Sequence, residues 1–254
     1  MKLHFLGTGT STGVPQIGCN CPTCTSTDPR DKRLRASVLI TPATGKNLLI
    51  DCGPDFRAQI LSVGAPELEA LLVTHSHYDH VGGLDDLRPY CKGGRNFPTY
   101  CRPDVAKDLR MRNPWSFGTH LYPGVPTFEI NKVNEYEPFT VGGVEVLPVQ
   151  VVHGRMPILG YRIGSLAYIT DCSQMPQRTL ESLAGLDTLV INALRIATHP
   201  THFSLAESLA VIEQLKPRCA YLTHLSHDMG PHASVSLPDG VQIAYDGLEI
   251  EISD

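Results

Sequence analysis

The chain has 254 residues, of which 42% are hydrophobic and 19% are charged, as in an ordinary globular protein. This composition excludes a collagen, a coiled coil and a disordered tail. Lys and Arg total 21 against 26 Asp and Glu, so the net charge is −5 and the chain lacks the basic field of a protein that wraps nucleic acid. The chain is rich in side chains that bind metals, with 8 Cys and 11 His.

The N-terminal segment 1–7 resembles a short strand that ends in glycine, without the apolar core of a signal peptide. No apolar run approaches the roughly 18 residues that a membrane span needs. We therefore expect a cytoplasmic protein without a membrane partner. In that reducing compartment, clustered cysteines bind metal more often than they form disulfides.

Short β-branched runs punctuated by Gly and Pro predict strands along the whole chain. The predicted strands cover residues 3–6, 37–41, 47–50, 70–73, 99–101, 127–130, 144–152, 159–163, 167–169, 188–191, 220–222, 241–245 and 248–252. Helical patterns predict helices at 54–63, 103–110, 174–183 and 204–215, the last with Ser204 as its N-cap and Glu207 three residues on. We therefore expect two sheets covered by helices in one layered α/β domain over residues 1–254.

The first dense motif is a cluster of three cysteines. Cys19, Cys21 and Cys24 lie within six residues, in a loop at about 18–25. Three thiols at this spacing can occupy three corners of a tetrahedral zinc site, with a histidine from elsewhere as the fourth ligand. The alternative is three reduced, unpaired cysteines. We predict a structural Zn²⁺ that holds an N-terminal loop, and we expect the other five cysteines to be small buried hydrophobes.

The second motif follows the apolar strand at 71–73, where the chain reads Thr-His-Ser-His-Tyr-Asp-His-Val-Gly-Gly from position 74. A strand end places His75 and His77 on one face, where they can hold one cation. A helical turn after them directs Asp79 and His80 toward a second cation. The alternative is a histidine-rich surface loop, but this spacing after a buried strand favours a two-metal site.

Three later strands each stop at a metal-binding residue. These residues are His153, Asp171 and His224, and strand ends are where α/β sheets present their chemistry. Taken singly, each is typical of an ordinary turn. Together with the motif at 75–80 they supply five His and two Asp, enough for two divalent ions that share one carboxylate and one water.

The motif at 74–82 resembles the H-x-H-x-D-H signature of the metallo-β-lactamase superfamily, and the three strand-end residues fall in the order of that family's remaining metal motifs. The resemblance covers nearly the whole chain and implies a four-layer αββα sandwich with a dinuclear site along one edge. It also implies that Asp51 supports the metal loop. The ligand assignments that it implies are His75, His77 and His153 for one ion, Asp79, His80 and His224 for the other, and Asp171 as the bridge.

The cysteine cluster, a Gly-Thr-Gly run at 7–9 and a Thr-His-Leu-Ser-His run at 223–227 are similar to features of the phosphodiesterases of the carbon–phosphorus lyase pathway. That family opens phosphoribosyl 1,2-cyclic phosphate in phosphonate metabolism. The resemblance implies that His227 is the fourth ligand of the structural zinc, and on spacing alone a solvated loop histidine stays open. It implies a metal-dependent phosphoric diester hydrolase that acts on a small cyclic phosphodiester.

Residues for catalysis and substrate binding come from the second half of the chain. His202, just before the predicted helix at 204–215, resembles the general-acid histidine of this family, and a helix neighbour without a catalytic part is the alternative. Asp79 is assigned to the catalytic residues as well as to the metal ligands. Arg155 and Arg195 are candidates for binding the phosphate, with ordinary surface charges as the alternative.

Several functions stay open. A tRNA 3′-processing-type nuclease uses the same metals, but it inserts a long arm where this chain has 17 residues between His153 and Asp171. Another hydrolase of the same fold and a non-catalytic metal-binding module are further candidates, and the intact ligand set argues against the module. His and carboxylate ligands suit Mn²⁺ and Zn²⁺ equally at the catalytic pair. The expected partner is a small-molecule phosphodiester rather than nucleic acid, and a homodimer is left open.

Overall fold

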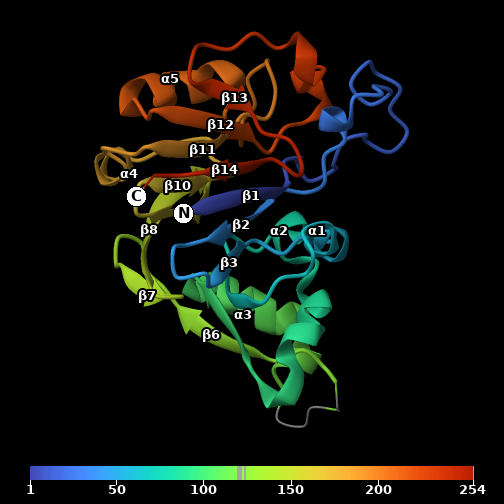
Figure 1. Ribbon diagram of the computed structural model, residues 1–254, viewed down its shortest axis with the longest axis vertical. Coiled ribbons are helices and arrows are strands. Elements are labelled where there is room, and N and C mark those ends of the chain that lie inside the picture. Colours follow the sequence, from blue (N-terminus) through green and yellow to red (C-terminus); the bar gives the residue numbers. More distant parts are fainter. Residues whose placement is uncertain (119–121, 123, 254) are drawn as a thin grey trace.

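The computed structural model describes residues 1–118, 122 and 124–253, and in this part of the chain two sheets of seven strands lie face to face (Figure 1). The first sheet has the order β14 (Glu249–Glu251), β1 (Lys2–Gly7), β2 (Ser37–Thr41), β3 (Asn47–Ile50), β4 (Leu68–Leu72), β5 (Phe97–Cys101) and β6 (Phe128–Lys132). The second has the order β13 (Val241–Ile243), β12 (Cys219–Thr223), β11 (Thr188–Asn192), β10 (Leu166–Ile169), β9 (Met156–Ile163), β8 (Val144–His153) and β7 (Phe139–Val141). Both sheets are mixed.

Helices cover the outer face of each sheet (Figure 1). The first sheet carries α1 (Phe56–Ser62), α2 (Tyr78–Val81) and α3 (Pro103–Arg112), and their buried residues form one cluster with its strands. The second sheet carries α4 (Gln177–Ser182) and α5 (Leu205–Leu215). The resulting four layers are the αββα sandwich expected from the sequence, of the metallo-β-lactamase type.

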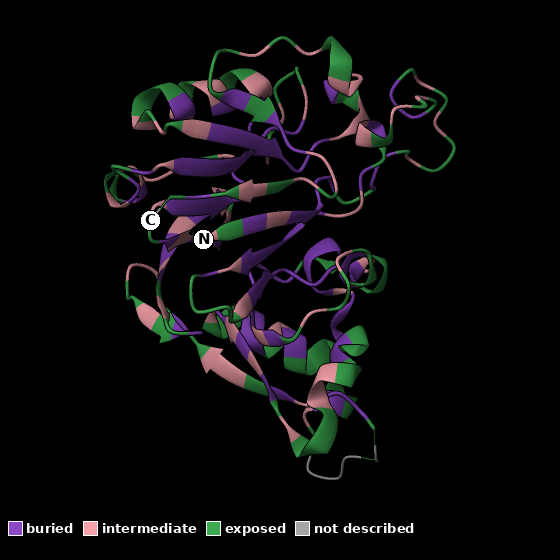
Figure 2. Cartoon of the chain, viewed as in Figure 1, coloured by how far each residue is buried: buried purple, intermediate pink, exposed green. Residues whose placement is uncertain are grey.

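Strand residues alternate between an inner and an outer core because successive side chains of a strand point to opposite faces. In β4, Ala70 and Leu72 belong to the core between the sheets, whereas Leu71 packs with the helices of the first sheet. In β10, Leu166 faces the other sheet and Ala167 faces α4 and α5. Figure 2 shows the same pattern, with buried strands and helices exposed on their outer faces.

The strand directions bring the carboxyl ends of several strands to one edge of the sandwich. β3 and β4 run parallel in the first sheet, as do β10, β11 and β12 in the second. The two sheets are joined near this edge, since the Leu159 amide donates to the Thr74 carbonyl (3.1 Å) and the Tyr161 hydroxyl donates to the Val73 carbonyl (2.7 Å). The chain segments that follow these strands therefore meet in space.

Some elements differ from the sequence prediction. The structure contains β7 and a 3-10 stretch at Leu84–Gly94 that is interrupted at Lys92 and Gly93. Hydrophobic periodicity indicated neither element, because a strand of three residues and an interrupted 3-10 stretch contain too few repeats to detect. β9 begins at Met156, three residues earlier than predicted. The predicted N-cap is confirmed: Ser204 and Glu207 form a capping box at α5.

None of the helices in the described ranges is long and apolar enough to cross a membrane. His120, for which we expect a structural or solvated role, lies outside the described residues.

Candidate metal centre

The loop that follows β4 supplies the first four candidate ligands. The strand ends at Leu72, and the chain passes through His75 and His77 before α2 begins at Tyr78. The rings of these two histidines lie edge to face with centroids 4.6 Å apart. The short helix α2 then turns Asp79 and His80 inward, and both are buried.

Three residues at the sheet edge adopt a left-handed backbone that few non-glycine residues tolerate. Asp51, Asp171 and His224 have φ values of 62°, 56° and 55°, and they follow β3, β10 and β12 directly or one residue later. Asp and His are among the side chains that enter this region at the lowest cost. The left-handed turn ends the strand and leaves each side chain buried at the same edge, where strained residues typically mark a functional site.

Three groups of candidate ligand atoms form at this edge, each with all its atoms within 4.8 Å of one another, and the third joins His153 and Asp171 with His202. The first group contains His75, His77 and His153. The second group contains Asp79, His80, Asp171 and His224. The structure thus brings together all seven residues that the resemblance implied as ligands.

The carboxylate of Asp171 lies between ligand atoms of the second group. Its oxygens are 3.2 Å from Nε2 of His80 and 3.2 Å from Nε2 of His224. Burial alone would raise the pKa of Asp171, but the nearby His224 and His80 hold that pKa well below its ordinary range. The ionised carboxylate is the form that binds a divalent cation.

Several buried imidazole nitrogens among the described residues make no hydrogen bond, which is the state expected of metal ligands. In the described part of the chain, Nε2 of His75, Nε2 of His80 and both ring nitrogens of His224 are buried without a hydrogen bond. A buried polar atom left unpaired costs stability, so a native site supplies a partner. A set of imidazoles and carboxylates fits divalent Mn or Zn as that partner.

Asp51 anchors the metal loop from outside the ligand set. Its Oδ2 accepts a hydrogen bond from Nδ1 of His80 (2.7 Å), and its two oxygens accept from the amide and hydroxyl of Thr74 (2.8 Å each). A carboxylate on the far nitrogen of a ligating histidine orients the ring and strengthens it as a ligand. Asp51 is thus placed to support the loop, as the resemblance implies.

His202 sits between the first and second groups. Its ring centroid is 4.6 Å from that of His153 and 5.0 Å from that of His224, and its Nδ1 is 3.7 Å from Oδ1 of Asp171. Burial, together with the neighbouring His224, lowers the pKa of His202 to about 3. A neutral imidazole in this position needs a nearby anion to take up a proton.

The cysteine cluster forms at the same end of the molecule. Cys19, Cys21 and Cys24 lie with His227 in one group of candidate ligands, and Nδ1 of His227 is 3.1 Å from the Cys19 sulfur and 3.4 Å from the Cys21 sulfur. The backbone N–H of Cys24 lowers the pKa of the Cys21 thiol to about 6. Because the thiolate is the form that binds zinc, this geometry fits a structural Zn²⁺.

The remaining predicted residues take different positions. Cys52, Cys101 and Cys172 are buried as expected, whereas Cys91 and Cys219 are only half-buried. Arg155 is exposed in the turn between β8 and β9.

Arg195 contacts its own loop. Its guanidinium donates to the carbonyls of Ala197 (3.3 Å) and Thr198 (2.8 Å). Binding of phosphate by Arg155 and Arg195 stays a prediction.

Two partners of the site were missed by sequence reasoning. Nδ1 of His153 donates to the Thr201 carbonyl (2.7 Å), and the Thr74 hydroxyl donates to Asp51. Every residue has a backbone carbonyl, so the sequence does not indicate which carbonyl binds His153, and the first contact was not predictable. The position of Thr74 directly before His75 was the only available hint of the second.

The four-layer sandwich with this ligand edge defines a metallo-β-lactamase fold. A sequence model described as the Beta-lactamase superfamily domain matches residues 46–225. The chain therefore belongs to the β-lactamase superfamily, as the sequence motifs predicted.

Within the superfamily, a solved structure described as a diphosphatase from the PhnP family is 42% identical, with a TM-score of 0.92 over 99% of this chain and 98% of that one. This level of identity over nearly the full length of both chains places the protein in that family.

Two further relatives say less about the function of this chain, because one is much longer and the other has low sequence identity. A Porphyromonas gingivalis protein named octanoyltransferase is 42% identical over all of this chain, but the chain spans only 52% of that protein's length. Zinc-bound PqqB from Methylobacterium extorquens is 22% identical and has a TM-score of 0.80, over 99% of this chain and all of that one. At that identity, PqqB supports the fold alone.

Proposed function

We propose that the chain forms one hydrolase domain that cleaves a small phosphodiester with two divalent cations, Mn²⁺ or Zn²⁺. The observation that supports this most strongly is the convergence of seven candidate ligands at one edge, with buried imidazole nitrogens that form no hydrogen bond within the described part of the chain. His75, His77 and His153 would hold one ion, Asp79, His80 and His224 the other, and Asp171 would contact both. When bound, the ions would activate a water and neutralise phosphoryl oxygens, which gives a protein of net charge −5 its affinity for an anion.

His202 is the side chain that we assign to protonation of the leaving oxygen. Its Nδ1 is buried and has no hydrogen-bond partner among the described residues, so one ring nitrogen stays available. A phosphate anion beside the ring raises the pKa of His202 from its low value, because an opposite charge favours the imidazolium. The protonated ring then donates to the departing oxygen, while Asp51 and Thr201 keep the ligand rings His80 and His153 in place.

The first candidate substrate is phosphoribosyl 1,2-cyclic phosphate, on the resemblance of the sequence motifs. A second candidate is a diphosphate, because the 42% identical structure is described as a diphosphatase. Both substrates present a phosphorus atom with a leaving oxygen, and the same residues serve either one.

The test is an assay of the metal-depleted protein after addition of Mn²⁺ or Zn²⁺. Its substrates are phosphoribosyl 1,2-cyclic phosphate, a 2′,3′-cyclic nucleotide, bis(p-nitrophenyl) phosphate and a nucleoside diphosphate. We expect metal-dependent turnover of the cyclic ribose ester, lost in His75→Ala and kept in the matched control His4→Ala on β1. Turnover of the diphosphate alone supports the second candidate, and no turnover of any substrate with any ion overturns the proposal.

A further inference from the structure

We propose that Arg195 is a positioning residue that holds the loop at 195–203 in the conformation that presents His202 to the leaving group. This inference rests on the proposed function, since His202 acts as an acid only if the chain cleaves a phosphate ester. The loop connects β11 to α5 and contains no helix or strand of its own. Its carbonyl groups are therefore satisfied by side chains or by water and not by a helix or strand ladder.

Arg195 supplies such a side chain for the outer part of the loop. Its Nη2 donates to the Thr198 carbonyl (2.8 Å) and its Nε to the Ala197 carbonyl (3.3 Å). The Arg195 carbonyl in turn accepts from the amide of Leu205, the first residue of α5. One residue thus joins the tip of the loop to the start of the helix.

The base of the loop is held independently of Arg195. The Phe203 amide donates to the Cys172 carbonyl (2.6 Å), and the Leu194 amide donates to the Phe203 carbonyl (2.9 Å). These bonds close the loop next to the candidate ligand Asp171. Only the segment between them depends on side chains for its shape.

The inner side of this segment contacts the metal edge. The Thr201 carbonyl accepts from Nδ1 of His153, and the Thr201 amide and hydroxyl contact Nδ1 of His199 at 3.4 and 3.2 Å. The His199 ring lies 5.2 Å from that of His202. Arg195 therefore binds carbonyls on the outer side of the segment that carries His202, and His153 binds a carbonyl on its inner side.

The guanidinium also reaches the segment that carries the cysteine-cluster ligand His227. Its Nη1 is 3.9 Å from Oδ2 of Asp228, and the Ser226 amide donates to the Leu194 carbonyl (2.9 Å). The half-exposed ion pair is weak by itself. Nε and Nη2 of Arg195 thus donate to carbonyls of its own loop, and Nη1 faces Asp228 beside the cysteine cluster. These contacts explain the position of Arg195 without a direct role in binding phosphate.

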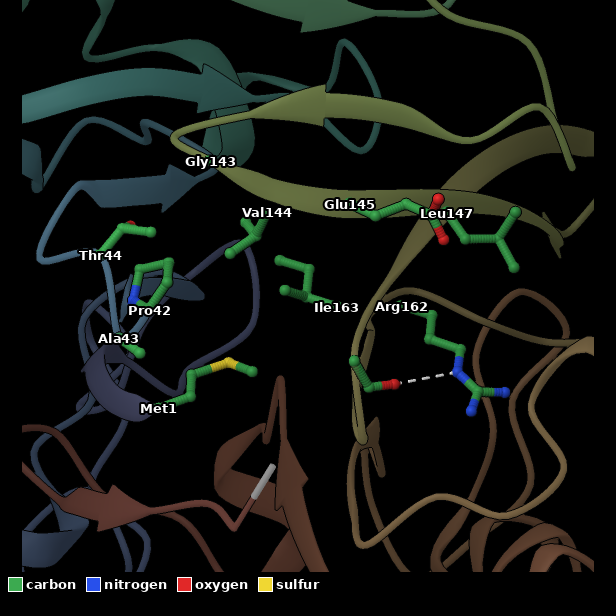
Figure 3. Close-up of a pocket in the computed structure, with 11 residues that line it drawn as sticks. Met1, Pro42, Ala43, Thr44, Gly143, Val144, Glu145, Leu147, Arg162 and Ile163 are labelled. Carbon is green, nitrogen blue, oxygen red and sulfur yellow. Dashed lines mark hydrogen bonds between the residues drawn. The ribbon is translucent and has the colours of Figure 1, made fainter.

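Arg162 provides a matched control at the opposite edge of the sandwich. Its guanidinium has the same pattern of bonds, with Nη1 donating to the carbonyls of Ser182 (2.7 Å) and Ala184 (3.0 Å) and Nε to the carbonyl of Gly164 (3.1 Å). It lines a cavity of about 620 Å³ beside Met1 and Val144, where β8 begins rather than where it ends (Figure 3). Loss of Arg162 removes comparable hydrogen bonds without touching the His202 loop.

The experiment compares Arg195→Gln with Arg162→Gln in two measurements. The first is hydrogen exchange of the metal-free protein. We expect the hydrogen-bonded amides of Thr201 and Leu205 to exchange roughly tenfold faster only in Arg195→Gln, because a loop that has lost two carbonyl contacts opens more often. The second is the hydrolysis rate of one ester with a poor leaving group and one activated aryl ester. We expect Arg195→Gln to lose about tenfold more rate on the poor leaving group, because only that ester needs the acid, and Arg162→Gln to change neither.

Other outcomes overturn the proposal. Three results would each show that Arg195 does not position the acid: equal losses on both esters, a raised KM with unchanged leaving-group dependence, or unchanged exchange of the Thr201 and Leu205 amides. If Arg195→Gln does not fold, Arg195→Lys replaces it, since a lysine keeps the charge but cannot span both carbonyls. If the wild type cleaves neither these two esters nor any substrate of the metal assay above, the proposed function is refuted instead, and the exchange measurement still decides whether Arg195 holds the loop.

Discussion

Among single residues of this site, His202 gives the most specific prediction for the effect of a substitution. We expect His202→Ala to lose roughly 10²–10⁴-fold in rate on an ester with a poor leaving group, the usual contribution of a general acid. The loss on an activated aryl ester is expected to be far smaller, because that leaving group departs without a proton. Steady-state rates on the two esters measure the difference, with His4→Ala as the control. Equal losses would contradict the acid role.

A second residue, Asp246, makes the stability of the chain depend on pH. Its carboxylate accepts from the Thr8 hydroxyl (2.7 Å) and from the Leu34 amide (2.6 Å), and burial raises its pKa from 3.8 to about 6. The folded chain therefore holds this proton more tightly than the unfolded chain does. The free energy of unfolding should fall by up to about 3 kcal/mol as the pH rises from about 4 to about 6.

Urea unfolding of wild type and Asp246→Asn between pH 4 and 7 measures this contribution, since other titrations are common to both and cancel. The variant should gain stability relative to wild type as the pH rises through this window. Asp239→Asn, at an exposed site, is the control and should run parallel to wild type. Parallel profiles for all three proteins would contradict the prediction.

At the scale of elements, the close contact between the segment after β3 and the metal loop needs glycine. A Cβ on Gly53 would lie 2.1 Å from the Asp79 carbonyl oxygen. The Cys52 amide donates to the His80 carbonyl (2.7 Å) within the same contact. A methyl group here must push the two segments apart and displace the candidate ligands on α2.

We therefore expect Gly53→Ala to cost roughly 1–3 kcal/mol of unfolding free energy, as overpacking does, and to weaken metal binding. Gly93→Ala is the control, because no atom of the described residues lies within 4 Å of its added Cβ and only its positive φ of 72° adds strain. That variant should lose about 1–2 kcal/mol and keep its metal affinity. Metal titration together with thermal melting separates the two, and equal metal affinity in both variants would contradict the contact argument.

At the scale of the whole molecule, the two metal centres should be separable. Elemental analysis is expected to find about three ions per chain, two at the sheet edge and one at the cysteine cluster. Cys21→Ser should lose one ion and keep the other two, whereas His75→Ala should lose metal from the edge and keep the cluster. Unchanged metal content in Cys21→Ser would refute the structural zinc.

Removal of the ions should also lower stability, because they bind the folded chain and not the unfolded one. An ion at 100 times its Kd stabilises the fold by about 2.7 kcal/mol. A chelator should therefore lower the melting temperature of wild type more than that of Cys21→Ser.

Local features of the sequence were enough for the fold class and most of the candidate ligands. The run from His75 to His80 has its spacing within six residues, and the period-two strands with ligand-type residues at their ends are visible without a structure. These features depend on neighbours along the chain, where strand and helix geometry fixes which side chains share a face. Family resemblance then extended them to the αββα sandwich.

Local patterning does not show which distant groups meet; the family resemblance implied some of these pairs, and the tertiary structure gives their contacts. His227 lies beside Cys19 across 208 residues of chain, and Asp51 reaches His80 across 29. Sequence patterning does not record the partners of Arg195 either, because they are backbone carbonyls of an irregular loop. Such contacts arise when the two sheets bury their facing side chains against each other, and that packing of residues remote in sequence determines which strand ends share an edge.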